Sequence, residues 1–105
     1  MSYVLATTMT LTPGAGTYLA FYSTSVSMNK NSETVSTILT VNGVDDADTE
    51  RQIGGQLGNL GSPVAHKKVT VADGQAIEIK WKISNNAGGG MGSMLERSLT
   101  LFKLA

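Results

Sequence analysis

Cysteine is absent from the 105-residue sequence, and its absence removes several kinds of chemistry at once. Without thiols there are no disulfides, no thiolate metal sites and no cysteine nucleophile, so the fold must be stable without covalent cross-links. Basic residues are not in excess either, because eight Lys and Arg balance eight Asp and Glu. A nucleic-acid-binding protein normally carries a basic excess, so we expect no nucleic-acid partner.

Long apolar runs are also missing. No segment approaches the ~20 apolar residues that a membrane-spanning helix needs, so we expect no membrane insertion. The first residues, Met1–Val4, lack the charged start and the apolar run of a signal peptide. A chain of this kind is expected to leave a cell only by lysis or inside a larger particle.

What the sequence does contain is an apolar pattern of period two, in a chain whose length suits a single domain spanning residues 1–105. The clearest case is Gln75–Ser84. One face of this segment carries Ile77, Ile79, Trp81 and Ile83, and the other carries Glu78, Lys80 and Lys82. The alternation predicts a strand with one face in the core and one in water, with Trp81 in the core.

Turn signals separate further strands. Asp73-Gly74 predicts a tight turn, which places Val69 and Val71 on the preceding antiparallel strand. Residues 34–41 form a run rich in β-branched residues, and Asn42-Gly43 after it is the strongest hairpin signal in the chain. The return strand is expected from Val44 to about Ile53.

Two segments carry apolar side chains on both faces. In residues 17–28, Leu19 and Phe21 lie on one face, and Tyr18, Tyr22 and Val26 lie on the other. The last strand, residues 94–104, likewise divides into two sets, which are Leu95, Leu99 and Leu101 against Phe102 and Leu104. Such strands need cover from a second sheet or from a neighbouring subunit. We therefore expect a homo-oligomer interface at Tyr18, Tyr22, Phe102 and Leu104, with Leu19 and Phe21 as the alternative to the two tyrosines.

The whole pattern predicts an all-β fold of seven or eight short strands without a helix. The first strand is expected over about residues 3–11, ended by the Pro13–Gly16 breaker, and glycine-rich loops are expected over residues 54–63 and 85–92. This spacing indicates an antiparallel β-sandwich of immunoglobulin or jelly-roll type. The Cys-Trp-Cys pattern of immunoglobulin domains is missing, which favours the jelly roll.

Several phrases in the sequence together carry a resemblance to a known family. They are residues 12–21 (TPGAGTYLAF), 39–44 (LTVNGV), 50–51 (ER), 74–81 (GQAIEIKW) and 97–101 (RSLTL). In this order they resemble small jelly-roll domains of tailed phages and marine viral sequences, which look like distant relatives of the tumour-necrosis-factor (TNF) and complement-C1q heads. The likeness covers nearly the whole chain, from Tyr3 to Lys103.

The resemblance implies a homotrimer of side-by-side sandwiches on the outside of a virion, made in the host cytoplasm. Relatives often form receptor- or carbohydrate-binding heads at fibre tips. This sequence starts at Met1 directly on its first strand, without a shaft segment, which favours a capsid decoration protein or an appendage subunit. The expected partners are copies of itself and capsid or appendage proteins. A host glycan or receptor is the partner under the alternative function, a receptor- or carbohydrate-binding head.

The candidate chemical sites are few. Asp45, Asp46, Asp48 and Glu50 are the only dense carboxylate group. The last three alternate and could face one way, as ligands for a hard cation such as Ca²⁺ do, but an acidic, solvent-facing strand is the favoured interpretation. His66 stands alone without a nucleophile beside it, and Glu50-Arg51 is expected to form a local or inter-subunit salt bridge.

Neither glycine-rich loop has the order of a phosphate-binding loop, and both are interpreted as strand connections that could bind a partner. The residues singled out in them are Gly54, Gln56, Asn59, Asn85, Asn86 and Met91. No catalytic group, metal or cofactor is expected, and an enzyme is not the predicted function.

Overall fold

The computed structural model describes residues 3–28, 34–54, 60–83 and 92–105, and these residues form eight strands. The strands are β1 (Val4–Leu11), β2 (Gly16–Met28), β3 (Thr34–Val41), β4 (Val44–Gly54), β5 (Leu60–Gly61), β6 (Val64–Val71), β7 (Ile77–Ile83) and β8 (Gly92–Lys103). The predicted bounds of the third strand are confirmed at both ends. The short β5 was not predicted, because it lies within a glycine-rich segment.

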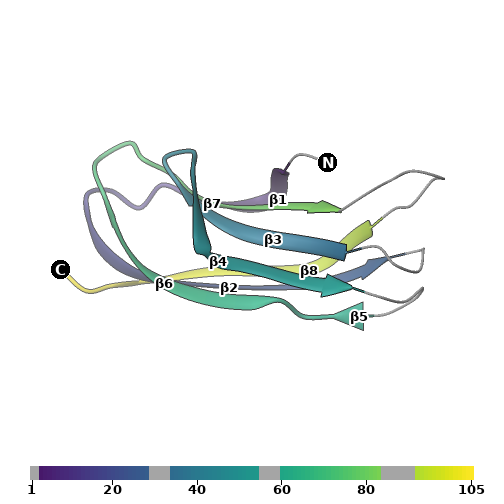
Figure 1. The fold of residues 1–105 in the computed structure, drawn as a ribbon. Coiled ribbons are helices and arrows are strands. Elements are labelled where there is room, and N and C mark those ends of the chain that lie inside the picture. Colours follow the sequence, from purple (N-terminus) through teal and green to yellow (C-terminus); the bar gives the residue numbers. More distant parts are fainter. Residues whose placement is uncertain (1–2, 29–33, 55–59, 84–91) are drawn as a thin grey trace.

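The strands form two antiparallel sheets that pack as a sandwich (Figure 1). The first sheet, called sheet A here, has the order β1-β7-β3-β4. In the second, sheet B, β2 lies in the middle, with β8 on one side and β6 and β5 on the other. The all-β sandwich is therefore confirmed. The terminal strands β1 and β8 lie at edges of different sheets, and the finer jelly-roll topology is not confirmed.

Asn42 and Gly43 form the predicted hairpin turn between β3 and β4. Both residues have positive φ, 51° and 79°, which is the requirement of a type I′ turn. The other predicted turn, Asp73-Gly74, joins β6 to β7, but these strands belong to different sheets, so it crosses the sandwich. The Asn42 N–H donates to the Ala76 carbonyl at 2.8 Å, which fastens the two connections together at one end of the sandwich (Figure 1).

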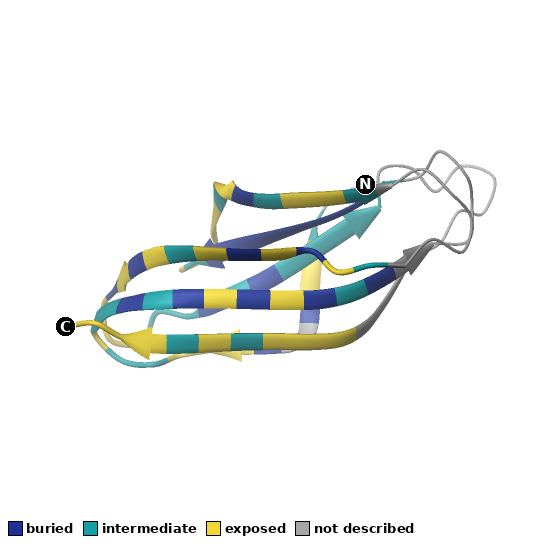
Figure 2. Cartoon of the chain, turned by 90° about the horizontal axis from the view of Figure 1, so that it is seen from below, coloured by how far each residue is buried: buried dark blue, intermediate teal, exposed yellow. Residues whose placement is uncertain are grey.

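The core lies between the sheets and follows the predicted alternation. Ile77 and Ile79 of β7 are fully buried, and Trp81 and Ile83 are half-buried and pack against the same core. Along β2, buried and exposed residues alternate, as Figure 2 shows for the middle strand of sheet B. The two-faced pattern of β2 thus has one face inside the sandwich and one face outside.

A polar network at the centre of this core joins the sheets. The Tyr22 hydroxyl of β2 donates to the Thr49 carbonyl of β4 at 2.7 Å. Because the phenol has one proton, the 2.9 Å contact with Thr37 Oγ1 of β3 has the threonine as donor. Burial raises the pKa of Tyr22, so the phenol stays protonated and keeps this donor role.

Thr49 occupies an irregular part of β4. Thr37 pairs with Arg51 but Leu39 pairs with Asp46, so residues 47–50 stand opposite Ile38 alone. The Leu39 N–H, which loses a ladder partner there, donates instead to Thr49 Oγ1 at 2.9 Å. Thr49 Oγ1 in turn donates to the Asp46 carbonyl at 2.7 Å. The side chain thereby satisfies backbone groups that the bulge would leave unpaired.

Thr49→Val tests this role, because it removes the hydroxyl at nearly constant volume. We expect the free energy of unfolding in urea to fall by about 1–3 kcal/mol, since the Leu39 N–H is left buried without a partner. Thr24→Val is the matched control, because Thr24 Oγ1 is buried and has no hydrogen-bond partner among the described residues. The control should be neutral or stabilising, and equal losses in both variants would contradict the assigned role.

Candidate functional site

The outward face of sheet B carries a cluster of aromatic rings. Side chains alternate along each strand, and the cross-strand partners of Phe21 are His66 on β6 and Thr100 on β8. The Phe21 ring lies 5.6 Å from the His66 ring and 5.7 Å from the Phe102 ring, edge-on to the latter. Leu19, directly opposite Phe102, is half-buried beside them. This group of rings on the outer face of the sheet is called the aromatic cluster below.

The aromatic cluster continues into exposed apolar residues at the β8 edge. Phe102 and Leu104 are 55% and 53% exposed. In the opposing sheet β1 contacts β8 and exposes Val4, Leu5 and Leu11. The side of the sandwich formed by β1 and β8, the β1/β8 side, therefore presents apolar side chains from both sheets. A concentration of this kind on one side is typical of a surface that contacts another protein.

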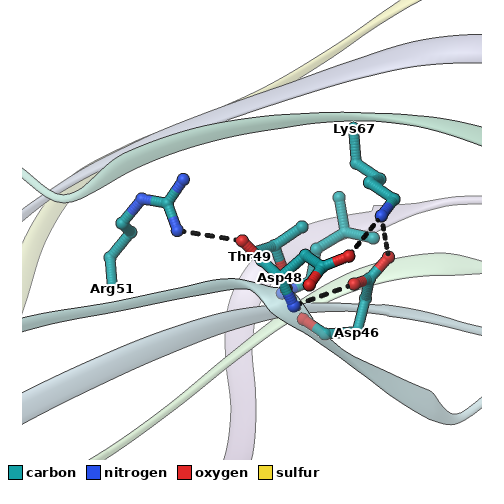
Figure 3. A network of polar contacts seen from close by, with 6 residues as sticks. Asp46, Asp48, Thr49, Arg51 and Lys67 are labelled. Carbon is teal, nitrogen blue, oxygen red and sulfur yellow. Dashed lines mark hydrogen bonds and ion pairs between the residues drawn. The ribbon is translucent and has the colours of Figure 1, made fainter.

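The opposite side, formed by β4 and β6, is closed by polar contacts. Lys67 of β6 places its ammonium 2.8 Å from Asp48 and 3.7 Å from Asp46 of β4 (Figure 3). Arg51 Nε donates to the Val64 carbonyl at 3.2 Å, so a guanidinium occupies a backbone acceptor at the edge of β6. These contacts link the two sheets across the β4/β6 side. Inward-turned charges of this kind also discourage pairing with another strand.

Two of the four residues expected at a subunit interface lie elsewhere. Tyr18 and Tyr22 are only 6% and 2% exposed, so they face the core of their own sandwich. Their hydroxyls have partners within the chain, Pro13 and Gly14 for Tyr18 and the central network for Tyr22. This corrects the expectation for both tyrosines, because buried side chains have no surface to offer a neighbour. The alternative pair, Leu19 and Phe21, faces outward.

The carboxylate group does not share one face. Asp46 and Asp48 both contact Lys67, whereas the Glu50 carboxylate accepts a hydrogen bond from the Tyr3 hydroxyl. Asp45 lies 3.9 Å from the Lys80 ammonium. The bulge at residues 47–50 breaks the alternation on which the expectation rested. Within the described residues, no three acidic or histidine side chains are arranged to hold a metal ion.

Tyr3 makes a contact that no sequence pattern indicated. From the N-terminal end of β1 its hydroxyl reaches Glu50 on β4, the strand at the other edge of sheet A. The Lys82 ammonium lies 4.4 Å from the centre of the Tyr3 ring. Burial, together with the neighbouring Glu50 carboxylate, raises the pKa of Tyr3. Tyr3 therefore spans sheet A on its outer face and helps to hold its two edges.

The remaining candidates have ordinary environments. His66 is exposed on β6 and contacts Phe21, and Arg51 also donates to the Asp48 and Glu50 carbonyls, at 3.0 and 2.8 Å. A local Glu50–Arg51 salt bridge is not formed, since these residues make the backbone contacts and the Tyr3–Glu50 bond instead, and the inter-subunit alternative stays a prediction. Gly54 ends β4 opposite Thr34. The other loop candidates, Gln56, Asn59, Asn85, Asn86 and Met91, lie outside the described residues.

No protein-family model matches this chain, and a search of curated proteins finds no sequence that matches it. Among the described residues, no helix is long and apolar enough to cross a membrane.

The Lys67 contacts predict a specific pH dependence of stability. The hydrogen bond from Lys67 lowers the pKa of Asp48, so this pair stabilises the fold above the ordinary Asp range of ~4. The stabilisation is lost as pH falls through the lowered value. The same bond raises the pKa of Lys67, whose contribution is lost only as pH rises through that raised value.

Lys67→Met should therefore lower the urea midpoint at neutral pH, by a small amount because the pair is exposed. The difference from the wild type should shrink as the pH approaches 2. Lys68→Met, at the exposed neighbouring position, is the control and should leave the profile unchanged. A constant difference across the acid range would show that Lys67 acts through packing alone.

Proposed function

We propose that this protein is a non-enzymatic structural protein of a phage virion surface, as a capsid decoration protein or an appendage subunit, and that it works by assembling with copies of itself. The observation that carries the proposal is the contrast between the two sides of the sandwich. Polar contacts close the β4/β6 side, where Val44 and Val64 are exposed singly, whereas the β1/β8 side exposes Phe102, Leu104 and three apolar residues of β1.

The virion and the number of copies come from the resemblance described above. It makes a homotrimer the expected assembly and the exterior of a virion the expected location. The finer relationship, a TNF/C1q-like jelly roll, belongs to the same proposal. Self-assembly itself does not depend on that relationship, since it is supported by exposed apolar surface that a single small domain leaves without cover.

Phe102→Asp tests the proposal, because it places a charge on the β1/β8 side without touching the core. We expect the wild-type chain to elute as an oligomer, a trimer or a hexamer made of two trimers by light scattering, and the variant to elute as a monomer. Val44→Asp is the matched control, since Val44 is 70% exposed in the hairpin after Asn42-Gly43 and lies away from β8. A monomeric wild type, or an oligomer that survives Phe102→Asp, would contradict the proposal.

A second function, a receptor- or carbohydrate-binding head, is supported by one observation. A shallow depression on the outer face of sheet B is lined by Phe21 and His66 together with Ser23, Ser98 and Thr100, which carry hydroxyl groups. An aromatic ring beside hydroxyl groups offers a sugar both a stacking surface and hydrogen bonds.

A glycan array separates the two functions. Saturable binding to a defined glycan that is lost in His66→Ala would favour the head. No binding on the array, together with affinity for purified capsids, would favour the decoration protein.

A further inference from the structure

The four sheet edges of this sandwich differ in how well they are protected against pairing with another strand. At β4 the ladder is interrupted at residues 47–50, and charged residues follow one another along the strand. At β1 the ladder is irregular between Leu5 and Thr10. At β6, Lys67 turns inward and Arg51 occupies the Val64 carbonyl. Each of these features is a known means of blocking an edge.

Between Arg97 and Lys103 the β8 edge lacks such protection, and its ladder with β2 shifts only before Arg97, between Thr24 and Val26. From Tyr18↔Lys103 to Thr24↔Arg97 its ladder with β2 is unbroken, so the strand is regular over this length. Residues 98–102, Ser-Leu-Thr-Leu-Phe, contain no charge, proline or glycine. An uncharged, regular edge rich in β-forming residues is the type that pairs readily with a further strand. Figure 2 shows this strand, which leads to the C-terminus, with its residues largely exposed at the margin of sheet B.

The hydrogen bonds to β2 determine which backbone groups of β8 point outward. The Leu104 N–H donates to the Thr17 carbonyl, so even-numbered residues of the regular ladder direct their backbone groups toward β2. On the other side of β2, the Thr24 N–H donates to the Pro63 carbonyl, which agrees with this alternation. The N–H and C=O groups of Arg97, Leu99, Leu101 and Lys103 therefore point away from the sheet.

We infer that β8 pairs antiparallel with β8 of a second copy across a two-fold axis, which joins two B sheets into one continuous sheet. This inference rests on the proposed self-assembly and specifies which groups make the contact. The four outward-pointing residues supply the hydrogen bonds, and the exposed Phe102 and the aromatic cluster lie on the adjoining outer face.

The charges of β8 exclude one register for this pair and are compatible with another. With the axis at Thr100, Arg97 of one copy lies opposite Lys103 of the other, and like charges facing each other are unfavourable. With the axis at Leu99, Arg97 lies opposite Leu101, and Ser98 lies opposite Thr100. Registers centred on Leu99 and on Leu101 both avoid facing like charges, and the one centred on Leu99 overlaps the longer part of β8. Leu99 of one copy then exchanges both backbone hydrogen bonds with Leu99 of the second copy.

A two-fold contact has a consequence for the number of copies. A dimer contains it alone, whereas a hexamer contains three such pairs arranged about the expected three-fold axis. A closed trimer cannot contain it, because each β8 would lack its partner. The number of copies therefore tests the proposed self-assembly, whereas the solvent exposure of the β8 amides tests the β8 contact.

Residue-resolved amide hydrogen exchange by NMR, at high and low protein concentration, tests the contact directly. In the assembled wild type we expect slow exchange, by 10-fold or more relative to the monomeric Phe102→Asp variant, at the amides of Arg97, Leu99, Leu101 and Lys103. The even-numbered amides, bonded to β2, serve as the internal control and should be protected in both proteins. Dimers or hexamers with this alternation support the inference.

A trimer in which the odd-numbered amides stay fast would overturn the β8 contact and leave the proposed self-assembly intact. A monomer would overturn both. Protection of the same four amides only after a different virion protein is added would overturn the assignment of a second copy as the occupant.

Cysteine cross-linking tests the register, and the chain offers a background without native thiols. Facing residues that are not hydrogen-bonded lie within disulfide reach. An oxidised mixture of the Ser98→Cys and Thr100→Cys variants should therefore give covalent dimers, and either variant alone should give few. Lys68→Cys mixed with Thr70→Cys, on β6 of the same sheet, is the matched control without dimers. Efficient dimers of Thr100→Cys alone would overturn the register centred on Leu99.

Discussion

The hydroxyl of Tyr22 lies at the centre of the sandwich and touches three strands. It belongs to β2 of sheet B, donates to β4 and accepts from β3 of sheet A. A polar group at this depth is tolerated only when its hydrogen bonds are complete, so the position of β4 relative to β2 is fixed within narrow limits. The bulge in β4 follows from the same constraint, because it brings the Thr49 carbonyl to the phenol and the Thr49 hydroxyl to Leu39.

Because of this central constraint, the β4/β6 side and the β1/β8 side differ in the polarity of their side chains. With β4 held against β2, Asp46 and Asp48 face β6, and Lys67 and Arg51 join the sheets there. No comparable charge pair is formed between β1 and β8 among the described residues, and apolar side chains gather at these two strands. The apolar side, on which the proposed assembly rests, and the side closed by polar contacts are thus opposite margins of one sandwich.

Most strands could be predicted from the sequence because alternation and turn dipeptides act locally. β3 and the Asn42-Gly43 turn are the clearest cases, since their geometry depends only on neighbouring residues. Alternation separates the two faces of a strand but does not say which face is inside when both are apolar. Tyr18 and Tyr22 were misplaced for that reason, whereas the partition of β8 into Leu99 and Leu101 against Phe102 is confirmed.

The contacts that close the β4/β6 side could not be predicted, because they join residues far apart in the sequence. Lys67 meets Asp46 and Asp48 only after β4 has bulged and the sheets have stacked. Tyr3 and Glu50 are likewise 47 positions apart. Nothing in the local composition around either residue identifies the other as its partner. The edge character of β8 also depends on sheet order, which local patterns do not determine.

The path of the chain between the sheets has a kinetic consequence. β3 and β4 are the only consecutive strands that pair with each other in the described ladders, and the turn after β6, like most other connections, crosses from one sheet to the other. Loop closure must therefore precede most native pairing, which is typical of β-sandwiches that fold in milliseconds to seconds. The Asn42-Gly43 hairpin can form earliest, while β1, with its eight uncharged residues, waits for β7, a strand synthesised more than seventy residues later. A newly made chain consequently exposes its first strand for the longest time, and crowded synthesis places the greatest risk of misassembly there.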